Sequence, residues 1–365
     1  MARHLYLHIP FCHRVCPYCS FHKHLPGNTD LSAFTDALLR ELDLRRLALR
    51  PETIYFGGGT PTFLSEIHLR RLLEGLTQRL DLSALREWTV EANPRTVLPI
   101  KADLLRAAGV TRISLGVQAW DEPTLRTLGR DHHPDDAEET FHILRRAGFA
   151  SLNLDLMFSI PGQSLETWQQ TLHRTLALQP DHISAYNLNY EEDTEFFERL
   201  QRGQYRELPE QDARFFDSTL DLLGAAGYRC YEISNHALPG HESIHNAAYW
   251  CGADYLGLGP GATSTVAGRR WQNARDTAHY MHRIANGELP ETDIEHLTAE
   301  QRRTERFGLE LRTARGLPAH LVDEPQQALL KQLARDGLLR VEDGFIRLTR
   351  EGQPLADSIA VALLD

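Results

Sequence analysis

Short apolar runs alternate with longer segments of helical periodicity from residue 4 to about residue 230, and this alternation is the strongest constraint on the fold. Strands are predicted at residues 4–9, 53–59, 87–94, 112–118, 151–160 and 182–190. Helices are predicted at residues 31–49, 65–79, 101–108, 134–147, 164–178 and 208–226. Six successive βα units indicate an α/β fold with parallel strands covered by helices. The order of the elements leaves open whether the sheet is open or a partial barrel.

The rest of the chain has a different pattern, so three regions are expected: 1–230, 231–290 and 291–365. Residues 231–290 are rich in loop residues and are interpreted as a connecting region. Helices are predicted at 299–315, 325–337 and 351–364, with two strands around Asp343-Gly344. This order resembles a winged-helix module of α+β type. Residues 291–365 contain 10 Lys/Arg against 14 Asp/Glu, so a structural or lid role is expected rather than DNA reading.

Three cysteines follow the first predicted strand with the spacing C-x3-C-x2-C: Cys12, Cys16 and Cys19. The irons of a [4Fe–4S] cluster are normally each held by a thiolate. Three thiolates with no fourth would leave one iron open to a small molecule that chelates through an amine and a carboxylate. Radical S-adenosylmethionine (SAM) enzymes use this spacing for that purpose, and the loop resembles theirs. The sequence therefore predicts a cluster held by these three cysteines.

Two other interpretations of the cysteines are weaker. A structural zinc site could use His13 or His22 as the fourth ligand, but zinc sites usually add a second, distant pair of ligands, and Cys230 and Cys251 match that pattern poorly. A disulfide framework does not fit the odd total of five cysteines or the absence of a signal sequence.

Composition limits the compartment and the partners. No apolar run reaches the length of a membrane span, so a cytoplasmic protein is expected, where thiols stay reduced. The formal net charge of −11 argues against a nucleic-acid partner, which would require a basic face.

Polar and glycine residues cluster at the ends of the predicted strands, where parallel sheets usually bind ligands. Glycines in Gly57–Thr62 would let backbone N–H groups approach a carboxylate, although a tight βα turn would explain them as well. Glu91 would suit a cationic amine or sulfonium, and a surface position is its ordinary alternative. Asp155 interrupts the apolar run 152–160, where a buried carboxylate needs a partner.

Several motifs together resemble one family: YLHIPFC-x3-C-x-YC, GGGTPT, EANP, SLGVQ, LGRDH and NLDLMFSIPGQ. They are similar to those of oxygen-independent coproporphyrinogen III dehydrogenases and the heme chaperones related to them. The resemblance covers nearly the whole chain. It implies a partial (β/α)6 radical-SAM barrel followed by an accessory C-terminal domain.

The resemblance also implies roles for individual residues. The three cysteines of the loop would hold the cluster. Tyr6, Gly58 and Glu91 match positions that contact the SAM bound to iron. A second set matches positions around a second SAM in the dehydrogenase: Gly59, Thr60, Gln118, Arg130 and Asp155. Tyr18 matches an aromatic residue that packs over the cluster or the adenine.

Two departures and one motif favour the chaperone branch over the dehydrogenase. Phe21 occupies the position of a further cysteine in the dehydrogenase loop, and the substantial segment that precedes that loop is missing here. The chaperone motif HNxxYW is matched by His245, Asn246, Tyr249 and Trp250. An imidazole flanked by aromatic rings could supply an axial ligand and a flat surface for heme. The alternative is a core histidine in an aromatic cluster.

The expected function is that of a heme chaperone with a [4Fe–4S] cluster and SAM, without coproporphyrinogen dehydrogenase activity. It would bind heme and deliver it to respiratory apoproteins at the membrane, associating with the membrane transiently, and a homodimer is a further expectation. The alternatives are the dehydrogenase itself, which decarboxylates propionates through a radical, and a radical-SAM enzyme with another substrate.

Overall fold

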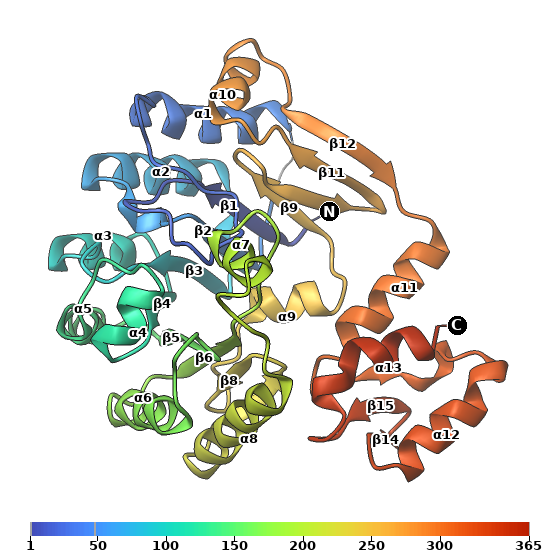
Figure 1. Cartoon of the computed structure of the whole chain (residues 1–365). Coiled ribbons are helices and arrows are strands. Elements are labelled where there is room, and N and C mark those ends of the chain that lie inside the picture. Colours follow the sequence, from blue (N-terminus) through green and yellow to red (C-terminus); the bar gives the residue numbers. More distant parts are fainter. Residues whose placement is uncertain (1, 47–48, 365) are drawn as a thin grey trace.

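Twelve strands form one sheet in the computed structural model, which describes residues 2–46 and 49–364 (Figure 1). Their order is β12-β11-β10-β9-β1-β2-β3-β4-β5-β6-β8-β7. The strands β1 to β6 are parallel neighbours and span His4–Ile9, Thr53–Gly58, Glu87–Ala92, Arg112–Gln118, Ser151–Phe158 and His182–Asn187. The expected α/β partial barrel is confirmed, and the sheet does not close.

Helices follow the parallel strands and cover the outer face of the sheet (Figure 1). The main ones are α1 Leu31–Leu44, α2 Glu66–Arg79, α3 Pro99–Ala107, α5 Pro134–Arg146, α6 Leu165–Ala177 and α8 Pro209–Ala225. Polar N-cap side chains set several starts, because Asp30, Ser65 and Ser164 accept hydrogen bonds from first-turn N–H groups. Residues 47–48 of the predicted helix 31–49 lie outside the described residues. Within the parallel part of the sheet, two short helices were not predicted, α4 Glu122–Thr127 and α7 Glu195–Gln201.

The period-2 alternation of the strands separates an apolar outer face from a polar inner face. In β1, Leu5, Leu7 and Ile9 are buried in the core under the helices. Tyr6 and His8 alternate with them and line a cavity on the inner side. This polar inner face creates space for ligands inside the curve of the sheet.

Residues 229–296 extend this sheet at both edges. Strand β9 pairs in parallel with β1, and β6 pairs antiparallel with β8. The elements are β7 Arg229–Glu232, β8 Asn235–Ala237, α9 Ile244–Trp250, β9 Tyr255–Leu258, β10 Thr263–Val266, β11 Arg269–Asn273, α10 Thr277–Ala285 and β12 Glu291–His296. The region interpreted as a connector thus contributes strands to the sheet, and pairing continues past residue 290. The three-region division of the chain stays a prediction.

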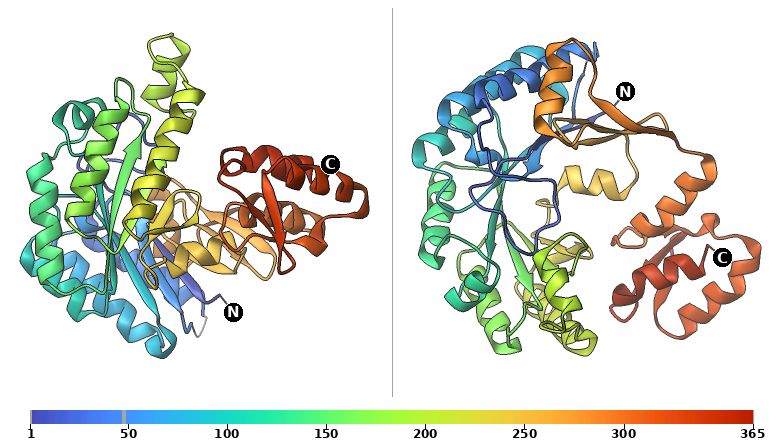
Figure 2. Two further views of the ribbon diagram at one scale, coloured as in Figure 1. Left: turned by 90° about the horizontal axis from the view of Figure 1, so that it is seen from below. Right: turned by 45° about the horizontal axis from the view of Figure 1, so that its top comes forward.

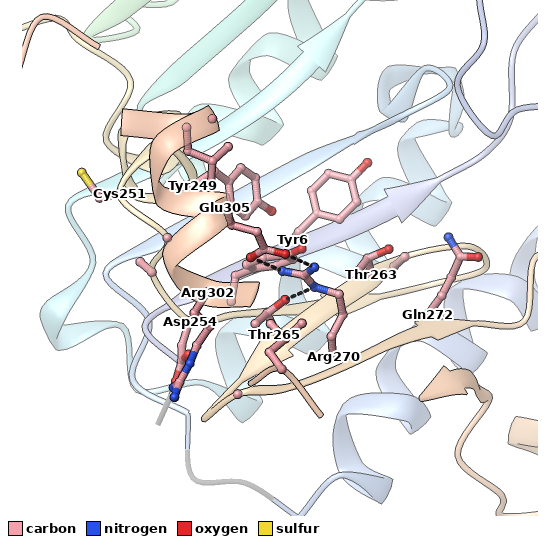
Figure 3. Close-up of a pocket in the computed structure, with 18 of the residues that line it drawn as sticks. Tyr6, Tyr249, Cys251, Asp254, Thr263, Thr265, Arg270, Gln272, Arg302 and Glu305 are labelled. Carbon is pink, nitrogen blue, oxygen red and sulfur yellow. Dashed lines mark hydrogen bonds and ion pairs between the residues drawn. The ribbon is translucent and has the colours of Figure 1, made fainter. Parts of the chain in front are cut away.

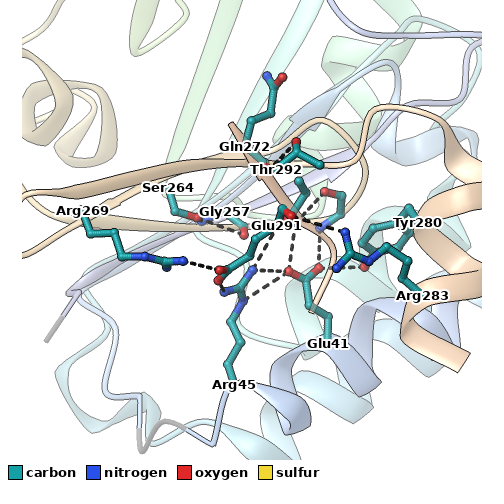
Figure 4. Close-up of polar contacts among 12 residues, drawn as sticks. Glu41, Arg45, Gly257, Ser264, Arg269, Gln272, Tyr280, Arg283, Glu291 and Thr292 are labelled. Carbon is teal, nitrogen blue, oxygen red and sulfur yellow. Dashed lines mark hydrogen bonds and ion pairs between the residues drawn. The ribbon is translucent and has the colours of Figure 1, made fainter. Parts of the chain in front are cut away.

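A buried carboxylate joins α1 to this extension (Figure 4). Glu41 accepts hydrogen bonds from the Tyr280 hydroxyl at 2.7 Å and from the Gly259 N–H at 2.9 Å. Arg45 donates to Glu41 at 2.6 Å and to Glu291 at 2.9 Å. A buried charge of this kind must be paired and fully hydrogen-bonded. The network therefore fixes β9 and β12 against the barrel.

The C-terminal residues form a unit with its own hydrophobic core, set to one side of the curved sheet (Figure 2). Its elements are α11 Ala299–Glu310, β13 Leu317–Pro318, α12 Gln327–Arg335, β14 Leu339–Glu342, β15 Phe345–Leu348 and α13 Ala356–Ala362. The strands form a small antiparallel sheet, as a wing does. Arg350 attaches this unit to α8 by ion pairs with Asp217 at 2.8 Å and Asp221 at 2.5 Å. In the described part of the chain, no helix combines the length and the apolar character needed to cross a bilayer.

Candidate functional site

A cavity of about 360 Å³ lies at the carboxyl ends of the parallel strands. The three cysteines of the loop line it together. Most of the other predicted site residues line it too: Tyr18, Gly58, Gly59, Thr60, Glu91, Gln118, Arg130 and Asp155. Because the carboxyl ends of parallel strands meet at one edge, residues from β2 to β5 converge on the cysteine loop that follows β1.

Polar side chains contact the thiols of Cys12 and Cys16 and the backbone of Cys19. The Thr60 hydroxyl donates to Cys12 Sγ at 3.6 Å, and the Arg130 guanidinium donates to Cys16 Sγ at 3.7 Å. Lys23 donates to the backbone carbonyl of Cys19. Burial raises the pKa of the Cys12 thiol to about 11. Among the described residues no three His, Cys, Asp or Glu side chains are gathered closely enough to hold a single metal ion. The three thiols surround a cavity instead.

The glycine turn after β2 packs directly against the start of the cysteine loop. Gly58 has φ of +109°, and a Cβ there would lie 2.6 Å from the His8 ring. A Cβ at Gly59 would lie 2.7 Å from backbone atoms of Pro10 and Phe11. Only glycine fits this close approach. The turn therefore has a structural requirement for glycine whether or not a ligand binds there.

Glu91 is a carboxylate buried at the wall of this cavity. The Tyr55 hydroxyl donates to its Oε1 at 2.8 Å. Burial raises the pKa of Glu91 to about 7, more than this hydrogen bond lowers it. Among the described residues no Lys, Arg or His side chain forms an ion pair with it within 4.0 Å. Glu91 can therefore accept a cationic or N–H-bearing group from a ligand.

Asp155 lies on β5, and neutral side chains donate hydrogen bonds to both of its carboxylate oxygens. Ser114 donates to its Oδ2 at 3.0 Å, and Asn153 donates to its Oδ1 at 2.7 Å. Burial raises the pKa of Asp155. Gln118, at the end of β4, has φ of +69°, a left-handed conformation that is uncommon outside glycine. Such local strain is frequent at functional sites.

Asn93 is a cavity residue that the sequence analysis missed. Its Nδ2 donates to the Thr60 hydroxyl at 2.8 Å, and its Oδ1 accepts from Arg130 at 2.7 Å. Arg130 also donates to the Gly116 carbonyl at 2.9 Å. Asn93 thus links the two groups that contact the Cys12 and Cys16 sulfurs. Its signal was present in the motif EANP, of which only Glu91 was considered.

These residues fit a [4Fe–4S] cluster with SAM. The donor set is three thiols around a shared cavity, and the buried carboxylate lacks a cationic partner. The cysteines would hold the cluster, and Glu91 and the glycine turn would face the amine and carboxylate of SAM. When bound, such a cluster would supply the electron that the cleavage of SAM requires.

Tyr6 lies outside this cavity. Its side chain lines a second, larger cleft on the other side of the cysteine loop, and its hydroxyl is 3.0 Å from His8 Nδ1. Tyr6 nonetheless lies close to Glu91, because a Cβ at Gly57 would lie 3.1 Å from both the Tyr6 ring and Glu91 Oε1. The expected contact between Tyr6 and SAM stays a prediction.

The HNxxYW residues form helix α9, on the inner side of the sheet at the amino ends of β1 to β3. The Glu87 carboxylate holds the start of this helix by accepting from the N–H groups of Ile244 at 2.8 Å and His245 at 3.0 Å. Tyr249 lines the larger cleft. Asn246 and Trp250, both half-buried, follow the same helix.

His245 is fully buried beneath α9. Its Nδ1 is 2.6 Å from the Thr53 hydroxyl, and its Nε2 has no hydrogen-bond partner among the described residues. The ring stacks on Tyr55 at 5.0 Å and meets Tyr249 edge to face at 4.7 Å. Burial lowers its pKa to about 3, so the imidazole is neutral. Ligation of heme iron by His245 would require α9 to move away from the sheet.

Comparison with known proteins identifies the family. The Radical SAM superfamily matches residues 6–175. "Heme chaperone HemW" of Bacillus subtilis is 35% identical, with 98% of both chains covered. "Heme chaperone HemW" of Escherichia coli is 41% identical over 72% of this chain and 70% of that protein.

The chain belongs to the HemW family of radical SAM proteins.

Membership in the radical SAM superfamily implies a [4Fe–4S] cluster and SAM. Among solved structures, coproporphyrinogen III oxidase (HemN) from Escherichia coli has a TM-score of 0.84 and 25% identity, covering 98% of this chain and 89% of that one. The similarity to HemN thus includes the sheet extension and the C-terminal unit of this chain as well as its parallel strands. The resemblance drawn from the sequence motifs is confirmed.

Proposed function

We propose that this protein is a heme chaperone, which binds heme and transfers it to respiratory apoproteins. The observation that carries this proposal is the similarity to the Bacillus subtilis heme chaperone, which extends over 98% of both chains. The similarity therefore includes the region of α9 and the C-terminal unit, where a heme site distinct from the cluster could be formed. A homodimer and a transient contact with the membrane remain parts of the proposal.

The cluster cavity would control the chaperone through SAM. Cys12, Cys16 and Cys19 would hold the cluster, and Glu91 would accept a hydrogen bond from the amine of SAM. Gly58, Gly59, Thr60, Gln118, Arg130 and Asp155 would line the space beside it, with Tyr18 packed against the loop. These residues bind and orient; none of them is assigned a catalytic step.

A second candidate is the oxidative decarboxylation of coproporphyrinogen, and one observation favours it. HemN shares the scaffold with a TM-score of 0.84 over 98% of this chain. Phe21 argues against it, because the dehydrogenase carries a cysteine at this position of the loop and this side chain is 71% exposed here.

One pair of assays separates these functions. Anaerobically reconstituted protein is incubated with coproporphyrinogen III, SAM and a reductant, and porphyrin products are measured by chromatography. In parallel, hemin is titrated into the same protein and the Soret band is recorded. We expect heme binding without decarboxylation. Decarboxylation in protein that binds no heme would overturn the chaperone and favour the dehydrogenase.

The role of His245 can be tested with the same titration. If α9 opens and the imidazole ligates the iron, His245→Ala loses or shifts the Soret band while the cluster content stays unchanged. If the buried ring only supports Tyr249, the variant keeps the position of the Soret band and binds heme more weakly. Tyr249→Ala and Trp250→Ala then distinguish lost contact area from lost ligation, because each aromatic ring can bury about 150–250 Å². Asn246→Ala tests the remaining polar residue of the motif.

A further inference from the structure

The largest space next to the cluster cavity is a cleft of about 1140 Å³ (Figure 3). Its walls come from the end of α9, from β9 to β11, and from α11 of the C-terminal unit. Ser20 and Phe21 line both this cleft and the cluster cavity, so the end of the cysteine loop separates the two spaces. Any molecule in the cleft would lie directly beside the cluster loop.

The cleft is cationic in a protein whose formal net charge is −11. Two carboxylates, Asp254 and Glu305, face five arginines: Arg270, Arg275, Arg302, Arg306 and Arg312. Arg270 is held by Glu305 through two hydrogen bonds of 2.5 and 2.9 Å (Figure 3).

Two of these arginines have no acidic partner among the described residues. Arg275 and Arg302 are exposed, and neither forms an ion pair within the part of the chain that the structure describes. Arg302 lies on α11, and Arg275 follows β11. An excess of guanidinium groups without protein partners suits a ligand that carries carboxylates.

Apolar side chains occupy the same walls. Phe21 is 71% exposed, and Tyr249 and Leu309 line the cleft together with it. These side chains place apolar surface beside the charged groups of the cleft. The combination of flat apolar surface and free guanidinium groups matches an amphipathic anion with an extended ring system.

Size decides which of the two spaces a macrocycle could enter. Ligand pockets for drug-sized molecules measure about 300–1000 Å³. The cluster cavity, at about 360 Å³, is at the low end of this range and is needed for the cluster and SAM. The cleft, at about 1140 Å³, lies slightly above this range, and the exposed Arg275 and Arg302 line it.

We infer that heme binds in this cleft, outside the cluster cavity, with its carboxylates toward Arg275 and Arg302 and its ring against Phe21 and Tyr249. This inference rests on the proposed heme function and assigns it a place. It gives helix α9 a role through Tyr249, which lines the cleft, rather than through direct access to the buried His245. The cluster loop then contacts both ligands, with Phe21 between them.

The test compares charge reversals at exposed arginines. Arg302→Glu and Arg275→Glu are titrated with hemin and with metal-free mesoporphyrin IX, which has the same two carboxylates and no iron. Arg335→Glu is the matched control, because Arg335 is also exposed and ends helix α12 away from the cleft. Circular dichroism and cluster absorbance verify that each variant is folded and loaded.

Each cleft variant is expected to bind hemin and mesoporphyrin about tenfold more weakly than the unchanged protein, because a charge-assisted contact is replaced by repulsion. The dimethyl ester of mesoporphyrin, which has no carboxylates, should bind all variants alike, and Arg335→Glu should resemble the unchanged protein.

The outcomes separate the two proposals. If the unchanged protein binds hemin and both cleft variants bind it equally well, the assignment of heme to this cleft is wrong, and the proposed heme function stands. If the unchanged protein binds mesoporphyrin in an arginine-dependent way and does not bind hemin, the cleft stands and the heme function fails. If it binds neither, both are wrong.

Discussion

The five cysteines differ in where they lie, and this difference in location leads to the first prediction. Cys12, Cys16 and Cys19 line one cavity, whereas the Cys230 thiol donates to the Glu232 carbonyl at 3.1 Å at the far edge of the sheet. Cys16→Ala should abolish the [4Fe–4S] absorbance after anaerobic reconstitution, because one iron would lose its thiolate.

Cys230→Ala is the matched control and should keep the full iron content, measured together with the absorbance near the cluster band. Cys251→Ala should do the same. Cluster loss in Cys251→Ala would show that the open iron has a fourth protein ligand, contrary to our assignment.

The second prediction concerns the pH dependence of SAM binding through Glu91. Its pKa is raised to about 7 by burial, so the carboxylate is mostly protonated below that pH. The ionised form is the stronger acceptor for the amine of SAM. SAM affinity, measured by calorimetry on the reconstituted protein, should therefore increase as the pH rises from 6 to 8.

Glu91→Gln should flatten this dependence and weaken binding by roughly ten- to hundred-fold, as expected for the loss of about 1.5–3 kcal/mol from a charge-assisted hydrogen bond. Without SAM, the contribution of Glu91 to the free energy of unfolding should change with pH in the opposite direction. A raised carboxyl pKa stabilises the fold at low pH, and this stability is lost as the pH rises through about 7. A variant with unchanged SAM affinity would remove Glu91 from the site.

Sequence motifs predicted the residues that line the cluster cavity better than the contacts that hold them. Asp155 was singled out because it interrupts an apolar run, but Ser114 and Asn153, which satisfy it, have no such signal. In the sequence, such polar residues cannot be distinguished from the usual alternation of polar and apolar side chains along a strand. Their role becomes visible only when the neighbouring strand is known. Long-range contacts of this kind depend on which strands are neighbours, and local patterns do not contain that information.

At the level of elements, strand burial explains what the sequence could predict. The strands β1 to β6 have continuous buried runs, so their positions were predicted within a few residues. Strands β7 to β11 have only three to five residues, with turn residues between them, and they were taken for loops. Their place is fixed by the pairing of β9 with β1 and of β8 with β6, the two outer strands of the parallel part.

The third prediction tests the Glu41 network that holds this extension. Glu41→Ala removes the acceptor of Tyr280, Gly259 and Arg45 together and leaves buried donors without partners. Breaking a buried ion pair in this way costs about 3–5 kcal/mol of the free energy of unfolding. The change is measured by chemical denaturation.

An exposed ion pair supplies the control for Glu41→Ala. Glu198 pairs with Arg202 at 2.9 Å, and both side chains are more than half exposed. Glu198→Ala should cost at most about 1 kcal/mol. A loss in Glu41→Ala no larger than in Glu198→Ala would mean that β9 and β12 are held mainly by their backbone pairing.

At the scale of the whole molecule, buried histidines couple stability to pH. Burial lowers the pKa of His8, His132 and His236 to about 4 and that of His245 to about 3. In the unfolded chain the pKa of each of these groups is near the ordinary histidine value of about 6.5. Between the two pKa values the unfolded state binds more protons, so the free energy of unfolding decreases as the pH falls below about 6.5. Each histidine contributes a slope of roughly 1.4 kcal/mol per pH unit in that window.

Buried carboxyl groups oppose this trend. The pKa values of Glu91 and Glu232 are raised to about 7, largely by burial, so the folded state retains these two protons between pH 4.5 and 7. Burial also raises the pKa of Asp155, and it lowers the pKa values of His4, His22 and His182. Seven histidines outweigh three carboxyl groups, so the fourth prediction is a net loss of stability from pH 7 to pH 5. It is checked by thermal unfolding at several pH values in the same salt.

His236→Leu isolates the histidine contribution. The side chain is 2% exposed, so leucine fits a site that is already dry, and the variant no longer has a group that gains a proton on unfolding. Its unfolding temperature should decrease less between pH 7 and pH 5 than that of the unchanged protein. His142→Leu is the control, because His142 is exposed on α5 and meets water in both states. Equal pH slopes in the two variants would show that His236 does not contribute, and that carboxyl groups paired in the folded state cause the acid sensitivity instead.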